Sequence, residues 1–317
     1  MPFLTEPEPQ RGIPLSVLPG IRRVVARNPS VMTYQGTNTY LIEVDDALVV
    51  IDPGPKDMQH VQEVLAAAGS TPIRHIVLTH THSDHWGAAA ALAKATGAPI
   101  ASYKISEKAG FEPDIALDDG ETVAGLTALH TPGHAADHLC FEHFLPDGTK
   151  ILFSGDHVMS WSSSIVSPPD GDMLAYYRSL ELLLARDEVV YLGGHGPLLA
   201  DPRVLVRELL EHRQFRERTI LAELKQQEWV VAALSAKLYD KTDPFLKAAA
   251  QRNVLAHMLK LKAEGFVEEH EPDTTPHPDT MLLTPPPGVQ DESGGEFAAM
   301  RADALRRFCL LYTSRCV

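Results

Sequence analysis

The chain has 317 residues, more than one domain usually contains, and this length predicts a large domain with a smaller one attached. Hydrophobic residues make up 44% and charged residues 22%, which is typical of a globular protein with a sizeable core. The formal net charge of −14 argues against a surface that binds polyanions in general, so a nucleic-acid substrate would need a local basic patch or bound cations.

Targeting segments are not evident in the sequence. The first residues lack the basic start and apolar run of a signal peptide, and no segment is long and apolar enough for a membrane helix. The three cysteines are irregularly spaced, which argues against a disulfide scaffold and fits a reducing compartment. We therefore expect a cytoplasmic protein with no membrane partner.

The first two thirds of the chain alternate between short β-branched runs and segments in which apolar residues recur with helical spacing. Strands follow strands at first and then alternate with helices, which predicts a layered α/β fold with sheets inside and helices outside. Strands are expected at residues 21–26, 39–44, 47–51, 73–79, 99–102, 126–130, 138–143, 151–154 and 189–192. Helices are expected at residues 58–68, 87–96, 173–185 and 202–226.

The pattern changes near residue 228. Two helices are expected at residues 230–239 and 245–263, followed by strands at 265–269 and 281–284, and this order is the outline of a winged helix. The expected organisation is therefore a large domain at residues 1–215, a winged-helix-like domain at 216–288, and a linker and tail at 289–317. We interpret the end of that tail as disordered or foreign to the domain.

One loop, Thr-His-Thr-His-Ser-Asp-His-Trp-Gly at residues 79–87, concentrates potential metal ligands. It follows a predicted buried strand, and the carboxyl ends of strands are where open α/β sheets place their sites. Because alternate residues of an extended chain point the same way, His80 and His82 can bind one ion. The following turn can direct Asp84 and His85 toward a neighbouring ion. Imidazole and carboxylate are the ligands that catalytic zinc accepts.

Three later loops each present one more candidate ligand after an apolar strand. His134 follows Gly133, which permits a sharp turn, and His195 follows a pair of glycines. Asp156 follows the predicted strand 151–154, where its carboxylate could bridge two cations. Each of these residues alone is a weak signal, but four such loops in succession predict a single metal site.

The HxHxDH loop with its later His, Asp and His residues resembles the signature of the metallo-β-lactamase superfamily over about residues 20–200. The resemblance implies a four-layer αββα sandwich at residues 1–215 and a binuclear zinc hydrolase that uses a metal-bridging hydroxide. It further implies that Asp84 orients the proton of the nucleophile. Asp52 is implied to support the loop of metal ligands without binding a metal itself. By the same resemblance, one zinc takes His80, His82 and His134, the other takes Asp84, His85 and His195, and Asp156 bridges them.

A narrower resemblance concerns residues 28–41, Asn-Pro-Ser-Val-Met-Thr-Tyr-Gln-Gly-Thr-Asn-Thr-Tyr-Leu. Together with the winged-helix-like C-terminus, this segment is similar to the group named for β-lactamase-like protein 2, which implies an endoribonuclease acting on single-stranded RNA. Thioester hydrolases of the hydroxyacylglutathione hydrolase type share all seven ligands but end in a helical domain unlike this C-terminus, and lactonases share the ligands too. A true β-lactamase of the best-known zinc subclass would carry cysteine at the position of Asp156, so it ranks below these. A non-catalytic binding protein would be expected to lack ligands, so it ranks last.

Charge tests the nucleic-acid interpretation. Residues 219–270 contain seven basic and seven acidic side chains, a balance that favours packing or dimerisation over nucleic-acid binding. A local patch at Lys247 and Arg252 remains open. The expected partners are therefore a small ester, thioester or lactone, or single-stranded RNA, with a homodimer as a further expectation.

Several other residues are expected near the ligands. Trp86, Trp161 and the loop 157–171 either line the substrate cleft or only pack against the fold. His138 either supports the site or is an ordinary strand residue.

Overall fold

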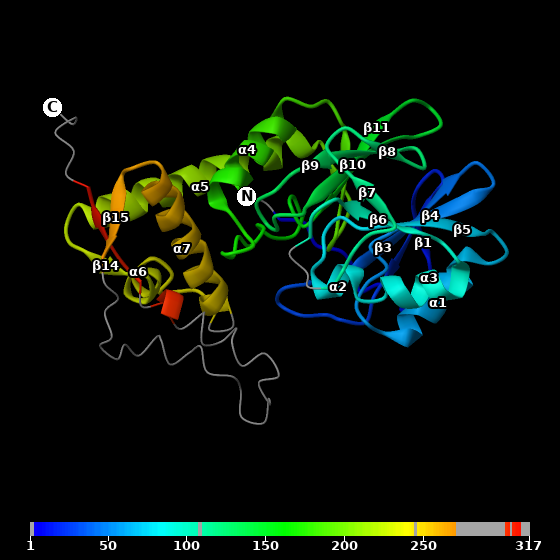
Figure 1. Cartoon of the computed structure of the whole chain (residues 1–317), viewed down its shortest axis with the longest axis horizontal. Coiled ribbons are helices and arrows are strands. Elements are labelled where there is room, and N and C mark those ends of the chain that lie inside the picture. Colours follow the sequence, from blue (N-terminus) through cyan, green and yellow to red (C-terminus); the bar gives the residue numbers. More distant parts are fainter. Residues whose placement is uncertain (1–2, 107–109, 244–245, 271–301, 305, 312–317) are drawn as a thin grey trace, which may run out of the picture. The chain divides into compact units, whose positions relative to one another are not determined.

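The computed structural model describes residues 3–106, 110–243, 246–270, 302–304 and 306–311 (Figure 1). The chain divides into two compact units. Unit 1 comprises Met1–Ser164 and Ala175–Leu209, and unit 2 comprises Ile165–Leu174 and Leu210–Val317. None of the helices in the described residues combines the length and hydrophobicity that a membrane span needs.

The first sheet of unit 1 has seven strands that neighbour one another in chain order. The pairs from β1 to β4 are antiparallel and those from β4 to β7 are parallel. The strands are β1 (Leu15–Leu18), β2 (Ile21–Val25), β3 (Asn38–Val44), β4 (Ala47–Ile51), β5 (Ile73–Val77), β6 (Ile100–Tyr103) and β7 (Ile115–Leu117).

Helices connect β4 with β5 and β5 with β6, because parallel neighbours need a crossover connection between them. The first, α1 (Met58–Ala68), begins where the Asp57 carboxylate accepts a hydrogen bond from the Gln59 backbone N–H, and it ends at Gly69. The short helix α2 (Ser83–Trp86) and α3 (Ala89–Thr96) connect β5 with β6. In Figure 1, α1 and α3 lie together beside the first sheet, and their apolar faces share a core with it.

The second sheet of unit 1 has six strands, in the order β13-β12-β11-β10-β9-β8. A buried core joins it to the first sheet, with Ile42 and Val49 from one sheet and Phe141 and Phe153 from the other. The elements are β8 (Thr122–Val123), β9 (Leu126–His130), β10 (Leu139–Phe144), β11 (Lys150–Gly155), α4 (Met173–Leu184), β12 (Val190–Gly193), β13 (Leu199–Ala200) and α5 (Pro202–Leu224). The sandwich of two sheets expected for the large domain is therefore confirmed.

Unit 2 contains the end of α5, two further helices and a three-stranded sheet in the order β14-β16-β15. Its buried core includes Ile220, Leu234, Leu255 and Phe308. The elements are β14 (Trp229–Val230), α6 (Val231–Leu238), α7 (Lys247–Ala263), β15 (Val267–His270) and β16 (Arg307–Leu310). The two helices and the first strand of the winged helix are close to where the sequence predicts them.

Two predicted elements need correction. The strand that pairs with β15 is β16, in the segment assigned to the tail beyond residue 288, whereas the expected return strand at 281–284 lies outside the described residues. Only Phe308 of its four residues is fully buried, so the strand is too short for its alternation to be recognised. The helix expected at 87–96 is present as α3 but begins two residues later, and a further short helix, α2, lies before it inside the ligand loop.

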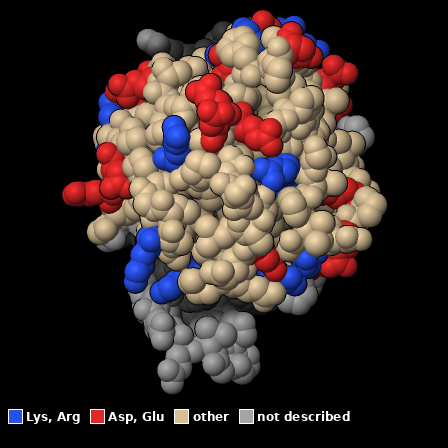
Figure 2. All heavy atoms as spheres, turned by 90° about the vertical axis from the view of Figure 1, so that its right-hand side faces the viewer, with Lys and Arg blue, Asp and Glu red and all other residues tan. Residues whose placement is uncertain are grey.

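Surface charge agrees with the excess of acidic residues. On the face drawn in Figure 2, Lys and Arg side chains lie singly or in small groups among Asp and Glu side chains. This face therefore presents no continuous basic patch of the kind that grips a polyanion.

Candidate metal centre

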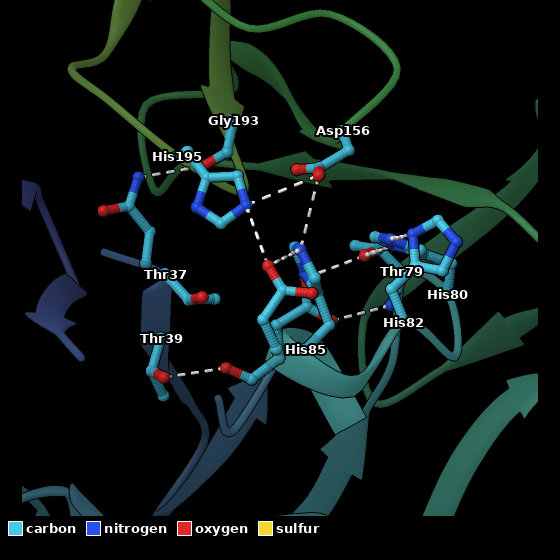
Figure 3. Close-up of polar contacts among 12 residues, drawn as sticks. Thr37, Thr39, Thr79, His80, His82, His85, Asp156, Gly193 and His195 are labelled. Atoms are coloured by element: carbon cyan, nitrogen blue, oxygen red, sulfur yellow. Dashed lines mark hydrogen bonds and ion pairs between the residues drawn. The ribbon is translucent and has the colours of Figure 1, made fainter. Parts of the chain in front are cut away.

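All seven predicted ligands lie in unit 1, in loops that follow the carboxyl ends of strands. The first four, His80, His82, Asp84 and His85, follow β5. The others follow β9, β11 and β12, and they are His134, Asp156 and His195, respectively. Figure 3 shows the side chains of His85, Asp156 and His195 pointing toward one another.

The first cluster consists of His80, His82 and His134, whose ligand atoms all lie within 4.8 Å of one another. The Nδ1 atom of His82 is 2.9 Å from Nε2 of His80 and 2.9 Å from Nε2 of His134. Both separations lie in the ordinary range of a hydrogen bond, and His82 Nδ1 meets two ring nitrogens at once, so the three nitrogens converge on one point.

The second cluster consists of Asp84, His85 and His195. The Oδ2 atom of Asp84 is 3.3 Å from Nε2 of His195 and 3.6 Å from Nε2 of His85. Both histidines are buried, whereas the Asp84 side chain is 26% exposed and therefore faces the opening of the site.

Asp156 lies between the two clusters. Its Oδ2 atom is 3.4 Å from Nε2 of His195, 3.5 Å from Nε2 of His85 and 3.7 Å from Nε2 of His134. One carboxylate oxygen thus faces nitrogens of both clusters, which is the placement that a bridging ligand needs.

A buried hydrogen-bond network fixes the proton positions on His80 and His85. The Asp52 carboxylate accepts from the Thr79 N–H at 2.8 Å, the Thr79 hydroxyl at 2.7 Å and His85 Nδ1 at 2.8 Å. Because the Thr79 hydroxyl gives its proton to Asp52, it must accept from His80 Nδ1, 3.0 Å away. Both imidazoles therefore present an Nε2 lone pair to the centre.

The loop of His195 is fixed from β3. His195 Nδ1 donates to the Gly36 carbonyl at 3.3 Å, so Nε2 is the nitrogen that faces the centre. The buried Asn38 side chain donates to the carbonyls of Gly193 at 3.0 Å and Gly196 at 2.9 Å. Asn38 thus holds the backbone on both sides of His195.

Comparison with known proteins agrees with this geometry. Residues 32–195 match the sequence pattern of the metallo-β-lactamase superfamily, more than half of the chain. The chain belongs to the metallo-β-lactamase superfamily. Residues 231–274 match a β-lactamase-associated winged helix domain, so the fold and the C-terminal domain expected from the sequence are both confirmed.

Several known proteins resemble the chain over much of its length. A β-lactamase-like protein 2 homolog of Caenorhabditis elegans is 31% identical over 280 residues, which are 84% of this chain and 91% of that one. An atrochrysone carboxyl ACP thioesterase of Claviceps purpurea is 29% identical over 214 residues, 66% of either chain. The crystal structure of a β-lactamase domain protein from Burkholderia ambifaria has the same fold, with a TM-score of 0.72, 18% identity and 96% coverage of both chains.

The residues at this site fit the metal ions that superfamily members bind. Among the described residues, His85 Nε2, His195 Nε2 and Asp156 Oδ1 are buried without a hydrogen-bond partner, which costs free energy unless a cation or water completes them. Tetrahedral zinc with Zn–N bonds of about 2.0–2.1 Å separates its ligand nitrogens by about 3.3 Å. The 2.9 Å separations around His82 are close enough to that spacing for a small shift to admit an ion.

Electrostatics favours a positive charge at the same point. Burial would raise the pKa of Asp156, but the neighbouring His195 and His85 imidazoles hold that pKa well below its usual value. Burial would lower the pKa of His195, whereas Asp156 raises that pKa to about 9. Burial beside His85 and His82 keeps the pKa of His80 well below its usual value, so its ring is neutral and offers a lone pair.

Glycine at position 194 is required by close packing around the centre. A Cβ atom on Gly194 would lie 2.5 Å from Asp156 Oδ1 and 2.6 Å from His85 Cε1. Any larger residue would displace one of these two side chains, so the backbone next to His195 approaches the site as closely as glycine allows.

The residues with open assignments now have definite places. His138 precedes β10, and its Nε2 accepts from the Asp156 backbone N–H at 3.2 Å, so it supports the centre. Trp86 packs edge-to-face on Phe111, with ring centroids 5.2 Å apart. Trp161 packs against Tyr34, with ring centroids 5.2 Å apart and ring planes inclined by 31°, beside the loop of His195.

The basic patch suggested at Lys247 and Arg252 is not found. Arg252 is buried in unit 2, where its guanidinium contacts Asp303 at 2.6 Å and the Ser167 hydroxyl at 3.0 Å. Its charge is therefore neutralised within the unit and does not serve as a surface cation.

Proposed function

We propose that this protein is a zinc-dependent hydrolase with two ions in one centre. His80, His82 and His134 would hold one ion, Asp84, His85 and His195 the other, and Asp156 would contact both. The observation that carries the proposal is the convergence of these seven side chains from four loops, with unpartnered buried atoms of His85, His195 and Asp156 at its middle.

The ions, when bound, would lower the pKa of water and polarise the attacked oxygen of the substrate. The protein side chains then have separate tasks. Asp84 is the more exposed of the two carboxylates in the centre, so it can accept and orient the proton of the nucleophile. Burial would raise the pKa of Asp84, but the neighbouring His85 and His195 imidazoles hold that pKa well below its usual value, so the carboxylate stays ionised.

For the substrate we propose single-stranded RNA. The support is the similarity to the β-lactamase-like protein 2 homolog, which extends over 84% of this chain and therefore beyond the metal-binding unit. A phosphodiester would need no extended basic surface if the cations of the centre themselves bind the phosphate oxygens.

A thioester is the second candidate. The Claviceps purpurea thioesterase is almost as similar in sequence, although over a shorter part of the chain. In unit 2, Lys237, Arg252, Lys260 and Lys262 all pair with carboxylates, which leaves fewer cations to hold RNA. The neutralised cations of unit 2 therefore favour testing a thioester as a substrate beside RNA.

The test is a parallel rate panel with one preparation of the full chain. It contains a single-stranded RNA, a hydroxyacyl thioester, an acyl-homoserine lactone and a chromogenic β-lactam, each with and without a chelator. We expect the RNA to be cleaved and the chelator to stop cleavage. The variant Asp187→Asn, at an exposed pair with Lys150, serves as a control that should match the wild type.

Other outcomes have clear meanings. A kcat/KM for the thioester or lactone that exceeds the RNA value by orders of magnitude would replace RNA as the substrate. Failure to hydrolyse any of the four in a chelator-sensitive manner would contradict the hydrolase proposal itself.

A further inference from the structure

Two residues that are not candidate ligands connect the loops of the first cluster. Thr81 lies between His80 and His82, and Asp137 lies three residues after His134. The Thr81 hydroxyl donates to Oδ2 of Asp137 at 2.5 Å, a short bond to a buried carboxylate. This bond joins the two loops that supply all three histidines of the cluster.

The bond is one of two hydrogen bonds, or rungs, that connect these loops. The Leu139 N–H donates to the Thr79 carbonyl at 2.7 Å, and Asp137 meets Thr81, two residues later in one loop and two residues earlier in the other. The two loops therefore run antiparallel here, with His80 between the rungs. The backbone rung sets the loops side by side, and the side-chain rung sets their separation at the end nearest to His82.

Neighbouring contacts keep both ends of the side-chain rung in place. The Ser106 hydroxyl is 2.9 Å from the Thr81 hydroxyl and must donate to it, because the Thr81 proton goes to Asp137. Next to Asp137, the Ala136 carbonyl accepts from His130 Nε2 at 2.9 Å. Further hydrogen bonds thus hold the backbone or side chain next to each end of the rung in place.

We propose that Thr81 and Asp137 are positioning residues that set the distance of His134 from His80 and His82, and so the affinity of the first cluster for its ion. This inference rests on the proposed function, because it assumes that an ion binds there. Asp84, His85 and His195 lie on the other side of the centre, so loss of the rung should affect one ion far more than the other.

The experiment is a zinc titration of the metal-stripped full chain against a competing chelator. The wild type should show two binding phases, and His134→Ala identifies the phase that belongs to the first cluster. Thr81→Val keeps the shape of the side chain but removes the hydroxyl, and we expect it to weaken that phase by about 10–100-fold, as loss of a supporting contact to a metal ligand does. The second phase should keep its wild-type affinity.

Three further variants separate positioning from general stability. Thr81→Ser retains the hydroxyl and should restore the affinity of the first phase, while Asp137→Asn, which keeps the size of the side chain, should weaken it. Thr96→Val removes a similar bond, from the Thr96 hydroxyl to the Leu92 carbonyl at 2.8 Å, away from the centre. It should lower the melting temperature of the stripped chain without changing either zinc phase.

The results distinguish this inference from the proposed function. Equal weakening of both phases in Thr81→Val, or no weakening in either phase, would overturn the positioning role while leaving the two-ion centre intact. Absence of both phases from the wild type would contradict the metal centre itself.

Discussion

Replacing Asp156 with asparagine is expected to lower kcat/KM by about 10³-fold or more, because the loss of several kcal/mol of charge stabilisation corresponds to about that factor. The amide keeps the size of the side chain but removes a negative charge that faces both clusters, with Oδ2 3.4 Å from His195 and 3.7 Å from His134. We expect the variant to fold and to retain fewer zinc ions than the wild type. Rates on the substrate identified by the panel, with zinc content measured on the same samples, check both expectations.

The matched control is Asp187→Asn, the same chemical change at a 75% exposed carboxylate that pairs with Lys150. It should leave rate and zinc content unchanged, since an exposed ion pair contributes little. An Asp156→Asn enzyme with two tightly bound zinc ions and more than a tenth of the wild-type kcat/KM would show that Asp156 does not join the two ions.

Asp52→Asn is the second substitution with a large expected effect. The Asp52 carboxylate accepts three hydrogen bonds, two from Thr79 and one from His85, whereas an amide brings N–H groups against at least one of these donors. We expect zinc affinity to fall by about 10–100-fold, because the proton positions on His80 and His85 are no longer fixed. The free energy of unfolding should fall by about 1–3 kcal/mol, the usual cost of an unsatisfied buried polar group.

Backbone strain should not complicate this variant. Asp52 has a φ of 50°, a left-handed conformation that asparagine also adopts readily. The control is Thr39→Val, which removes the bond from the Thr39 hydroxyl to the Asp52 carbonyl but leaves the carboxylate in place. Zinc titration and chemical denaturation of both variants distinguish a specific role of the carboxylate from general destabilisation. If Thr39→Val weakens zinc binding as much as Asp52→Asn does, the effect is general destabilisation and the carboxylate has no special role.

The convergence of the seven candidate ligands could be predicted from the sequence because each follows an apolar strand within a few residues. His80, His82, Asp84 and His85 lie in one short loop, so their proximity follows from chain geometry alone. His134, Asp156 and His195 are separated by many residues, but each follows a strand of the second sheet. A sandwich of two sheets whose strands end at one edge brings such loops together.

Other features depend on contacts between distant residues that no local pattern records. The Asp52–Thr79 bond arises because β4 and β5 are parallel neighbours, with Ile51 beside Val77, so the residues that follow them end side by side. The interruption between α2 and α3 has a similar cause, since the Ala88 N–H donates to the Gly54 carbonyl at 2.9 Å and a Cβ atom on Gly87 would lie 2.6 Å from the Lys56 backbone nitrogen. Both could be found only once the pairing of the strands and the course of the following loop were known.

The position of β16 could not be predicted for a related reason. Its pairing with β15 joins His270 to Arg307 across a long intervening segment. The sequence pattern favours a partner strand in the nearest β-like segment, at residues 281–284. Short strands in which a single side chain such as Phe308 enters the core carry too little periodicity to correct that choice.

The central claim is that seven side chains hold two zinc ions, and a crystal structure of the zinc-loaded protein tests it most directly. Anomalous difference maps from data above and below the zinc absorption edge would locate the ions. We predict two peaks, one at about 2.0–2.2 Å from His80, His82 and His134 and one at the same distance from Asp84, His85 and His195, with Asp156 contacting both. A single peak, or peaks bound by other residues, would contradict the account.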